Sequence, residues 1–327
     1  MRAIKAIVDG FGGDGAPISI LEGCASARRE SGAEIICVGD TKIIKDVAHD
    51  NNISLDGIEI VSAESVISVE DPPTEIRTKH SNCSMAVGLR LLKEDQGDFF
   101  VSAGSTGALV VGGSLIIGRN PEIKRPALAT FLPSLTGCFM LIDSGANCDC
   151  KPETLKFFAK LGCELATFCS SQKPRVGLLN IGVESIKGNK LQQNTFDLLK
   201  DSPEINFIGN VEPNGAISGD CDVLVTDGFS GNIFLKSMEA VSTFMLSELS
   251  GIFSANIFNK LAALRLRSDL KMLKKRLDPS NFGGAPLVGL NKLVLKVHGG
   301  ANAHVVKNTI MQGLEMKNKA NGAKNEF

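Results

Sequence analysis

Short apolar runs alternate with amphipathic stretches along most of this 327-residue chain. The runs have the length of strands buried on both faces, and many of the stretches between them have the apolar spacing of helices. The predicted strands are Ile4–Val8, Glu34–Val38, Ile58–Val61, Phe99–Ser102, Ala127–Leu132, Cys138–Ile142, Val176–Ile181, Asn206–Ile208, Val223–Thr226 and Leu293–Val297. This alternation predicts an α/β fold with a mostly parallel sheet, helices on both faces and right-handed crossovers.

The alternation stops between Ile233 and Leu277, where no strand pattern is present. We expect two helices with a break near Ser250–Gly251, forming a hairpin inserted at about 233–277 in a single α/β domain over residues 1–327. Apolar residues lie around the break, namely Ile252, Phe253, Ile257, Phe258 and Leu261. The second helix is basic, with a single acid, Asp269, against Lys260, Arg265, Arg267, Lys271, Lys274, Lys275 and Arg276. This pattern is typical of a segment that binds a membrane surface or an acidic protein, and a hairpin at a dimer interface is the structural alternative.

The composition argues against several classes of function. A net charge of −1 is unlike the strongly basic balance of a general nucleic-acid-binding protein. Tyr and Trp are absent, so no tyrosine serves as an acid or a base. The nine cysteines, scattered from Cys24 to Cys221, favour a reducing cytosol over a disulfide framework. Cys148 and Cys150 are the only close pair, and with no second pair or nearby histidine we expect no metal site there.

Two parts of the chain bear on targeting and membrane insertion, the N-terminal segment and an uncharged stretch. The chain runs straight into a strand pattern, so we expect no secretory signal. Phe99 to Gly118 carries no charged residue and is long enough to cross a bilayer. Its scattered glycines divide it into a strand, a turn and a helix, so we expect no transmembrane segment.

Several glycine-rich or polar loops follow predicted strands, where ligands bind in folds of this class. The central one follows Val176–Ile181 and brings Lys187, Gly188 and Asn189 to the start of a helix predicted over Lys190–Lys200. The first N–H groups of a helix lack intrahelical partners and favour an anion, and a lysine adds a mobile positive charge. An ordinary loop with a solvated lysine would have the same pattern.

A second loop, Asp9 to Pro17, follows the first predicted strand. Its glycines match G-x-G-x-x-G, the dinucleotide-binding pattern, which is weak by itself. Asp9 and Asp14 would repel a pyrophosphate unless a metal intervened. We therefore favour an anion or substrate loop over a nicotinamide site.

The Ala103–Gly107 loop is similar to a nucleophile elbow, with alanine in place of the first glycine of G-x-S-x-G. Asp227 and His298 follow in the order found in α/β-hydrolases, which makes a triad with Ser105 one alternative. The other is that small residues let the backbone approach a phosphate. The imperfect elbow favours the second alternative.

Two further loops carry candidate polar groups. Asp143 to Asn147 offers an acid that is catalytic, binds substrate or only caps a turn. Asp227 to Asn232 opens a helix predicted to begin near Ile233, so Asn232 would lie in its first turn as an oxyanion donor or as a cap. His298 follows a predicted strand, which makes it a better functional candidate than the other three histidines, His49, His80 and His304.

The motifs, taken together and in order, resemble those of the PlsX family, the acyl-ACP:phosphate acyltransferases of bacterial phospholipid synthesis. They include Val8–Pro17, Ser105–Ala108, Arg125–Thr130, Asp143–Asn147, Cys150–Glu153, Val176–Gly182, Lys187–Asn189, Ile208–Glu212, Asp227–Asn232 and Gly283–Pro286. The resemblance implies transfer of a long-chain acyl group from acyl carrier protein (ACP) to inorganic phosphate, which feeds glycerol-3-phosphate acylation. It also implies a three-layer α/β/α sandwich similar to the isocitrate/isopropylmalate dehydrogenase and phosphotransacetylase group, and a cytoplasmic homodimer that attaches peripherally to membrane through the hairpin, with no metal or other cofactor.

By this resemblance Lys187 binds phosphate and stabilises developing charge, and Asn232 donates to the thioester carbonyl oxygen. His298 would protonate the leaving thiolate. The expected phosphate and substrate residues are Asp9, Gly12, Gly13, Ser105, Thr106, Gly107, Asp143, Asn147, Gly188, Asn189 and Asp227. ACP would bind Arg265, Arg267, Lys271, Lys274 and Lys275, and membrane would contact Ile252, Phe253, Ile257 and Phe258.

Three departures from the family pattern affect these roles. Val8–Asp14 reads VDGFGGD where the family usually has VDAMGGD, and Ser105 replaces a usual asparagine. His298 is followed by GGANA where the family usually has GSSDA. The rival functions are a serine acyl-hydrolase or thioesterase that uses Ser105, a non-catalytic scaffold that binds ACP or membrane, and a nicotinamide dehydrogenase.

Overall fold

A computed structural model describes residues 3–121, 123, 125–166, 173–277 and 283–323. The chain forms two compact units, the first made of Met1–Ala129 with Phe282–Phe327 and the second of Thr130–Asn281. Two such units can be the halves of one domain, so the single domain expected over residues 1–327 stays a prediction.

The first unit is built on a mostly parallel sheet with strand order β3-β2-β1-β4-β11-β10. Its strands are β1 (Lys5–Asp9), β2 (Glu34–Gly39), β3 (Ile58–Ser62), β4 (Phe99–Ser102), β10 (Ala285–Val288) and β11 (Leu293–Lys296). Ile7 of β1 lies between Ile36 of β2 and Phe100 of β4, and all three side chains are fully buried. Strand β10 runs antiparallel to β11 and was not expected from the sequence, since glycines precede it and Pro286 interrupts it.

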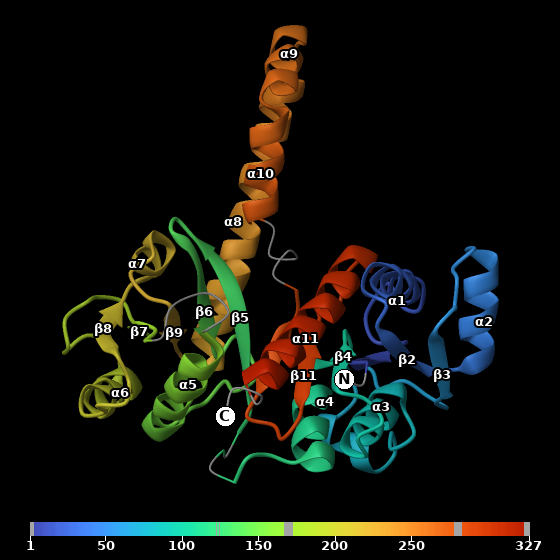
Figure 1. The fold of residues 1–327 in the computed structure, drawn as a ribbon. Helices are drawn as coiled ribbons and strands as arrows, with labels where there is room; N and C mark the ends of the chain where they lie inside the picture. The colour runs from blue at the N-terminus through green and yellow to red at the C-terminus, as the bar shows by residue number, and fades with distance from the viewer. Residues whose placement is uncertain (1–2, 122, 124, 167–172, 278–282, 324–327) are drawn as a thin grey trace. The chain divides into compact units, whose positions relative to one another are not determined.

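Helices cover both faces of this sheet. They are α1 (Ile18–Ser31), α2 (Thr41–Asp50), α3 (Ser84–Lys93), α4 (Thr106–Gly112) and α11 (Ala303–Ala323), with the short helices η1 (Pro73–Arg77) and η2 (Gly113–Ile117). A Cβ added at Gly313 of α11 would lie 2.3 Å from the Phe99 ring, and one at Gly88 of α3 would lie 2.3 Å from the Phe100 ring. Successive side chains of a strand point to opposite faces, so α11 and α3 cover opposite faces of the sheet. Helix α1 packs beside α11 (Figure 1).

The second unit has the strand order β5-β6-β9-β7-β8. The strands are β5 (Ala127–Ser134), whose first three residues belong to the first unit, β6 (Gly137–Ile142), β7 (Val176–Leu179), β8 (Phe207–Val211) and β9 (Val223–Val225). Strands β6, β9, β7 and β8 are parallel to their neighbours. Their carboxyl ends therefore lie along one edge of the sheet, and the loops that follow β6, β9 and β7 are neighbours.

Helices also cover both faces of the second sheet. They are α5 (Pro152–Leu165), α6 (Lys190–Lys200), α7 (Pro213–Ser218) and α8 (Gly228–Ser254). Val223 of β9 packs against Gly162 of α5, whereas the next residue, Leu224, belongs to an apolar cluster with Phe234 of α8. Each unit thus has helices on both sides of a mostly parallel sheet, which confirms the predicted three-layer α/β/α class.

The helical hairpin differs from the sequence prediction at three points. Helix α8 begins at Gly228 rather than near Ile233, because the Asp227 carboxylate caps it by accepting from the Ser230 N–H (2.9 Å). The break falls after Ser254 and not at Ser250–Gly251, since Asn256 caps α9 (Ile257–Arg265) by accepting from the Asn259 N–H (2.9 Å). The second predicted helix is two helices, α9 and α10 (Arg267–Leu277).

The hairpin extends away from the sheet of the second unit (Figure 1). Its α10 end is fastened by the Arg276 guanidinium, which donates to the Ser134 and Leu135 carbonyls at 2.6 and 2.7 Å. Within the described residues, every helix alone is too short or too polar to cross a membrane. Helices α8 and α9 are long and apolar enough to cross a membrane only when taken together, and they meet at a bend of 119°.

Candidate active site

The loop after β7 presents Lys187 on a frame of amide side chains. Asn180 Nδ2 donates to the Lys187 carbonyl (3.1 Å), and Asn210 Nδ2 donates to the Glu184 carbonyl (2.8 Å). Gln193 Nε2 donates to the Ile186 carbonyl at 2.7 Å and to the Gly188 carbonyl at 3.2 Å. Asn180 and Asn210 are buried, whereas the Lys187 side chain is exposed. The backbone is therefore held while the ammonium group stays free to meet a ligand.

Gly188 and Asn189 have defined structural roles beside Lys187. Gly188 has φ of 86°, and a Cβ added there would lie 2.6 Å from Asn180 Oδ1, so only glycine fits this turn. Asn189 Oδ1 caps α6 by accepting from the Leu191 N–H (2.7 Å) and the Gln192 N–H (3.4 Å). Lys187 to Asn189 do precede a helix, as predicted. Two of the helix N–H groups expected to bind an anion are already occupied, so an anion at this loop would depend chiefly on Lys187.

Asp143 organises the loop that follows β6. Its fully buried carboxylate accepts from the N–H groups of Gly145 (3.0 Å), Ala146 (2.9 Å) and Asn147 (2.8 Å), and from Asn147 Nδ2 (2.8 Å). Four donors satisfy both carboxylate oxygens. Of the three alternatives for Asp143, the structure therefore supports the turn-forming role.

The loop after β9 packs directly on the Asp143 loop. The Gly228 N–H donates to the Asn147 carbonyl (2.7 Å), and a Cβ added at Gly231 would lie 1.9 Å from the Asp143 carbonyl oxygen. Asn232 is exposed and lies over Gly145, whose added Cβ would be 3.5 Å from Asn232 Cβ.

The expectation that Asn232 lies in the first turn of its helix, or caps it, is wrong. Asp227 is the cap, and its carboxylate also accepts from the Ser230 hydroxyl (2.9 Å). Asn232 is thus placed further along α8, where its amide does not serve the helix terminus.

Apolar side chains border these loops in the second unit. Ile181, Val183 and Ile186 precede Lys187 in the same loop and are 81%, 63% and 78% exposed. On the neighbouring loop and helix, Phe229 and Ile233 are also exposed. Large apolar residues exposed on the loops at one sheet edge are typical of a binding surface.

In the first unit, three loops meet through glycines. A Cβ added at Gly12 would lie 2.6 Å from the Gly104 nitrogen, and one at Gly13, where φ is 95°, would lie 2.7 Å from the Gly299 carbonyl oxygen. The Asp14 N–H donates to the same Gly299 carbonyl (2.8 Å). Neighbouring loops therefore lie within contact distance of both glycines, and this packing accounts for the absence of side chains at the two positions. The expected contact of Gly12 and Gly13 with substrate stays a prediction.

Asp9 lies beneath this junction. Its buried carboxylate accepts from the Ser102 hydroxyl at 2.7 Å and from the Phe11 N–H at 3.3 Å. Burial raises the pKa of Asp9, and the hydrogen bonds from Ser102, Ser84 and Phe11 and the charge of Lys296 oppose that rise. The Asp9 carboxylate is thus hydrogen-bonded to groups of the protein itself, and its expected contact with substrate stays a prediction.

Ser105 does not have the geometry of an elbow nucleophile. Its side chain is 7% exposed, and Oγ caps α4 by accepting from the Ala108 N–H (3.4 Å). A nucleophile elbow instead presents its hydroxyl at the top of the turn. The structure supports the other alternative, in which small residues shape the turn: Gly107 is exposed, with an added Cβ 2.9 Å from Pro73, and Thr106 is partly exposed.

His298 is exposed just past β11. Its Nδ1 faces the Gly300 N–H at 3.1 Å and accepts from it, which places the proton of the neutral ring on Nε2. That Nε2–H can donate a hydrogen bond, and protonation of the leaving thiolate by His298 stays a prediction. The neighbouring Lys296 is buried, and its ammonium group donates to the Ala103 carbonyl (3.3 Å) and the Val297 carbonyl.

The sequence reasoning missed Lys296 and the amides Asn180 and Asn210. Each is a polar residue within or at the end of an otherwise apolar strand run, and that signal was available in the sequence. The predicted residues fall in two groups, Asp143, Asn147, Lys187–Asn189, Asp227 and Asn232 in the second unit and Asp9, Gly12, Gly13, Ser105–Gly107 and His298 in the first.

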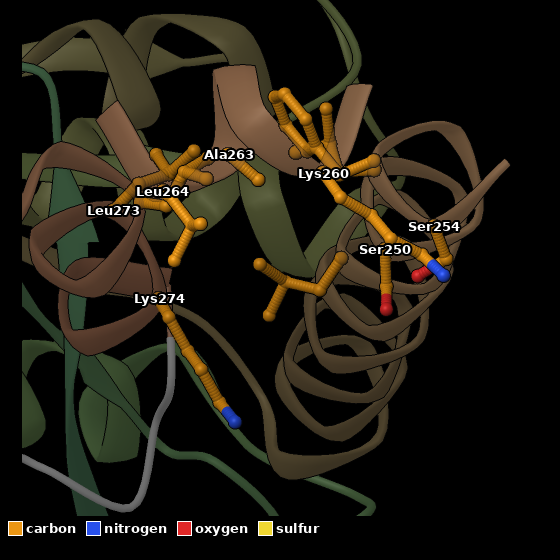
Figure 2. A pocket seen from close by; sticks show the side chains of 11 residues that line it. Ser250, Ser254, Lys260, Ala263, Leu264, Leu273 and Lys274 are labelled. Atoms are coloured by element: carbon orange, nitrogen blue, oxygen red, sulfur yellow. The ribbon is translucent and has the colours of Figure 1, made fainter. Parts of the chain in front are cut away.

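Helices α8, α9 and α10 of the hairpin line an open cavity of about 590 Å³. Leu264, Ala263 and Leu273 lie on one part of its wall, and Lys260 extends toward Ser250 and Ser254 on another (Figure 2). Phe253 lines this cavity, whereas Ile252, Ile257 and Phe258 are exposed, and their contact with membrane stays a prediction. The basic residues expected to bind ACP are exposed but divided between α9 and α10, namely Arg265, Arg267, Lys271, Lys274 and Lys275.

Comparisons with known proteins agree along nearly the whole chain. Residues 4–323 match the family model described as "Fatty acid synthesis protein". A phosphate acyltransferase of Acetivibrio thermocellus is 41% identical over 94% of this chain and 91% of its own length, and one of Halothermothrix orenii is 40% identical over 97% and 96%. A solved phosphotransacetylase from Streptococcus pyogenes has a similar fold, with a TM-score of 0.63 and 18% identity over 96% of this chain and 94% of its own.

Proposed function

The chain belongs to the fatty acid synthesis protein family, the PlsX family of phosphate acyltransferases, and we propose that its acyl donor is long-chain acyl-ACP and its acceptor inorganic phosphate. The chain is an acyltransferase enzyme. The acyl phosphate product would then feed acylation of glycerol 3-phosphate. The observation that carries the proposal is the exposed Lys187 on a loop held by amide side chains, with exposed apolar side chains before it in the same loop.

The chemistry requires placement and charge stabilisation. A phosphate oxygen attacks the thioester carbonyl, the C–O bond forms, the C–S bond breaks, and ACP leaves as the thiolate that is then protonated. Lys187 would hold the phosphate and neutralise its charge, and holding both reactants in contact removes much of the entropic cost of their meeting. Asn232, exposed on α8, would donate to the carbonyl oxygen as negative charge develops there.

The apolar border favours a long acyl chain over a short one. Ile181, Val183 and Ile186 precede Lys187 in the same loop and are largely exposed. They would contact the first methylene groups of a chain whose carbonyl carbon lies near the lysine. Roles for Ser105, Thr106, Gly107 and His298 in phosphate binding and thiolate protonation stay predictions.

We assign ACP docking, membrane attachment and dimer formation to the hairpin. The basic residues of α9 and α10 complement the acidic surface of ACP, and reversing Lys271 and Lys275 should raise KM for acyl-ACP with KM for phosphate unchanged. Exposed Ile257 and Phe258 beside the bend would enter a lipid surface of a cytoplasmic membrane. Vesicle flotation that is unaffected by Phe258→Asp would contradict the membrane assignment, and a monomer by sedimentation would contradict the homodimer.

One experiment separates this function from its rivals. The enzyme is incubated with long-chain acyl-ACP, with acyl-CoA as an alternative donor, in the presence and absence of phosphate, and the acyl product is identified by mass spectrometry. We expect acyl phosphate and free ACP in equal amounts, only with phosphate, and faster from acyl-ACP. Free fatty acid without phosphate would indicate a hydrolase, and no turnover would indicate a scaffold.

A further inference from the structure

Three metal-ligating side chains meet in the first unit, away from the loops described above. Asp71 precedes η1, Glu75 lies within it, and His80 follows it. His80 Nε2 is 3.5 Å from Asp71 Oδ2 and 3.6 Å from Glu75 Oε2, and the three atoms all lie within 4.8 Å of one another. We propose that this cluster binds a divalent metal ion such as zinc, and that the ion holds η1 and its flanking residues against α4.

Two of the three atoms are buried and unsatisfied. Glu75 Oε2 and His80 Nε2 are inaccessible to solvent and have no hydrogen-bond partner among the described residues. The His80 side chain is 12% exposed. The Lys79 ammonium is 3.7 Å from Glu75 Oε2, but it belongs to an exposed side chain and lies beyond hydrogen-bond distance. Buried polar atoms of a native protein normally have partners, and an ion between them accounts for both.

The spacing matches metal ligands better than hydrogen-bonded groups. An N–H donor to a carboxylate lies at about 2.7–3.2 Å, which is shorter than both distances here. Nitrogen and oxygen ligands at about 2.0–2.2 Å from a tetrahedral zinc ion lie about 3.3–3.6 Å apart. A neutral imidazole with two carboxylates balances a divalent ion, and three protein ligands leave one position for water.

Local hydrogen bonds hold the cluster in this geometry. The Ser68 N–H donates to Asp71 Oδ2 (2.8 Å), which orients that carboxylate. The His80 N–H donates to the Glu75 carbonyl (2.9 Å), which ties His80 back to the middle of η1. The Glu75 N–H in turn donates to the Pro72 carbonyl (3.0 Å).

The segment that carries the ligands packs on the Ser105 turn and on α4. A Cβ added at Gly107 would lie 2.9 Å from Pro73 Cγ, and one at Gly112 would lie 2.6 Å from Ile76 Cδ1. Ile76 is fully buried between two of the ligands along the chain. An ion bound by Asp71, Glu75 and His80 would therefore fix η1 against the start of α4. Its role is to position this turn, with no contact to substrate.

The test uses the full-length protein freed of metal by chelator dialysis. Zinc binding is measured by calorimetry in the wild type, in His80→Ala and Asp71→Asn, and in His304→Ala, which removes an exposed histidine. A Cys148→Ser background removes an exposed thiol, so that zinc taken up by this group does not enter the titration. We expect one zinc per chain, a higher melting temperature with zinc, and an affinity lowered more than about 100-fold by His80→Ala but unchanged by His304→Ala.

Binding of cobalt in place of zinc tests the site in the wild-type protein, so the result does not depend on whether a variant folds. We expect the strong visible absorption of tetrahedral cobalt, displaced by one equivalent of zinc. Absence of binding in the wild type overturns the proposal, and so does binding that survives His80→Ala or an octahedral cobalt spectrum. Each readout is independent of acyl transfer, so this proposal and the proposed function can fail separately.

Discussion

The two loops with the strongest sequence signals are built by different means. The 181–188 loop of the second unit is held by side-chain amides that bind its carbonyls, so its backbone is fixed while Lys187 remains exposed. The Asp9–Pro17 loop of the first unit is held by backbone approach, with Gly12 and Gly13 pressed against neighbouring loops. The difference teaches that glycines at a strand end can serve packing between loops, whereas an exposed lysine on a fixed loop is available to a ligand.

Removing the positive charge of Lys187 should have the largest effect on the rate of the reaction. Lys187→Ala is expected to lower kcat at least about 100-fold, because the donor to the developing charge is lost. The melting temperature should stay unchanged, since the side chain is exposed and the loop is held by other groups. Steady-state kinetics with acyl-ACP and phosphate measure this, with the exposed Lys190→Ala as the control. Equal losses in the two variants would mean that general charge, and not position, matters.

Adding a methyl group at Gly12 of the Asp9–Pro17 loop should lower the stability of the fold, with its main effect on folding and not on the reaction. Gly12→Ala is expected to lower the free energy of unfolding by about 1–3 kcal/mol, because the new Cβ meets the Gly104 backbone at 2.6 Å. Gly251→Ala, in an open position on α8, should raise it by about 0.5–1 kcal/mol. Urea unfolding measures both. A fully stable Gly12→Ala enzyme would restore the ligand-binding interpretation of the glycine pattern.

Weakening the amide frame should have the smallest effect. Asn180→Ala removes the donor to the Lys187 carbonyl and the acceptor for the Ile181 N–H (2.8 Å), so we expect about 1–2 kcal/mol less stability and about tenfold slower turnover. Gln193→Ala, at an exposed position, should do less. Hydrogen exchange by mass spectrometry should show faster exchange over residues 181–188. Unchanged exchange would mean that the loop is held by its backbone.

Much of the fold follows from the periodicity of the sequence. Buried strands such as Phe99–Ser102 can be predicted from the sequence, because strands of a parallel sheet that is covered on both faces are short continuous apolar runs. Strand β10 was missed, since Pro286 and the preceding glycines give no such run. The start of α8 and its break after Ser254 were misplaced because side-chain caps at Asp227 and Asn256, rather than apolar spacing, decide them.

The local structure around the candidate residues was predictable only in part, and their roles in the reaction stay predictions. Lys187 is placed before a helix as expected, but the capping by Asn189 could not be distinguished from anion binding in sequence. Asp143 was ambiguous for the same reason, because a carboxylate that binds four donors of its own loop and one that binds substrate have the same sequence signal. The Asp71, Glu75 and His80 cluster depends on a short irregular turn that no periodicity indicates.

The amide frame around residues 181–188 also has a consequence for how tightly substrates need to be held. A loop that is already in its working shape loses little conformational freedom when an anion arrives, so less of the interaction with substrate is consumed in ordering the protein. More of the binding energy therefore remains to stabilise the transition state. An enzyme preorganised in this way can combine fast turnover with weak retention of phosphate, an abundant ion that it has no need to store.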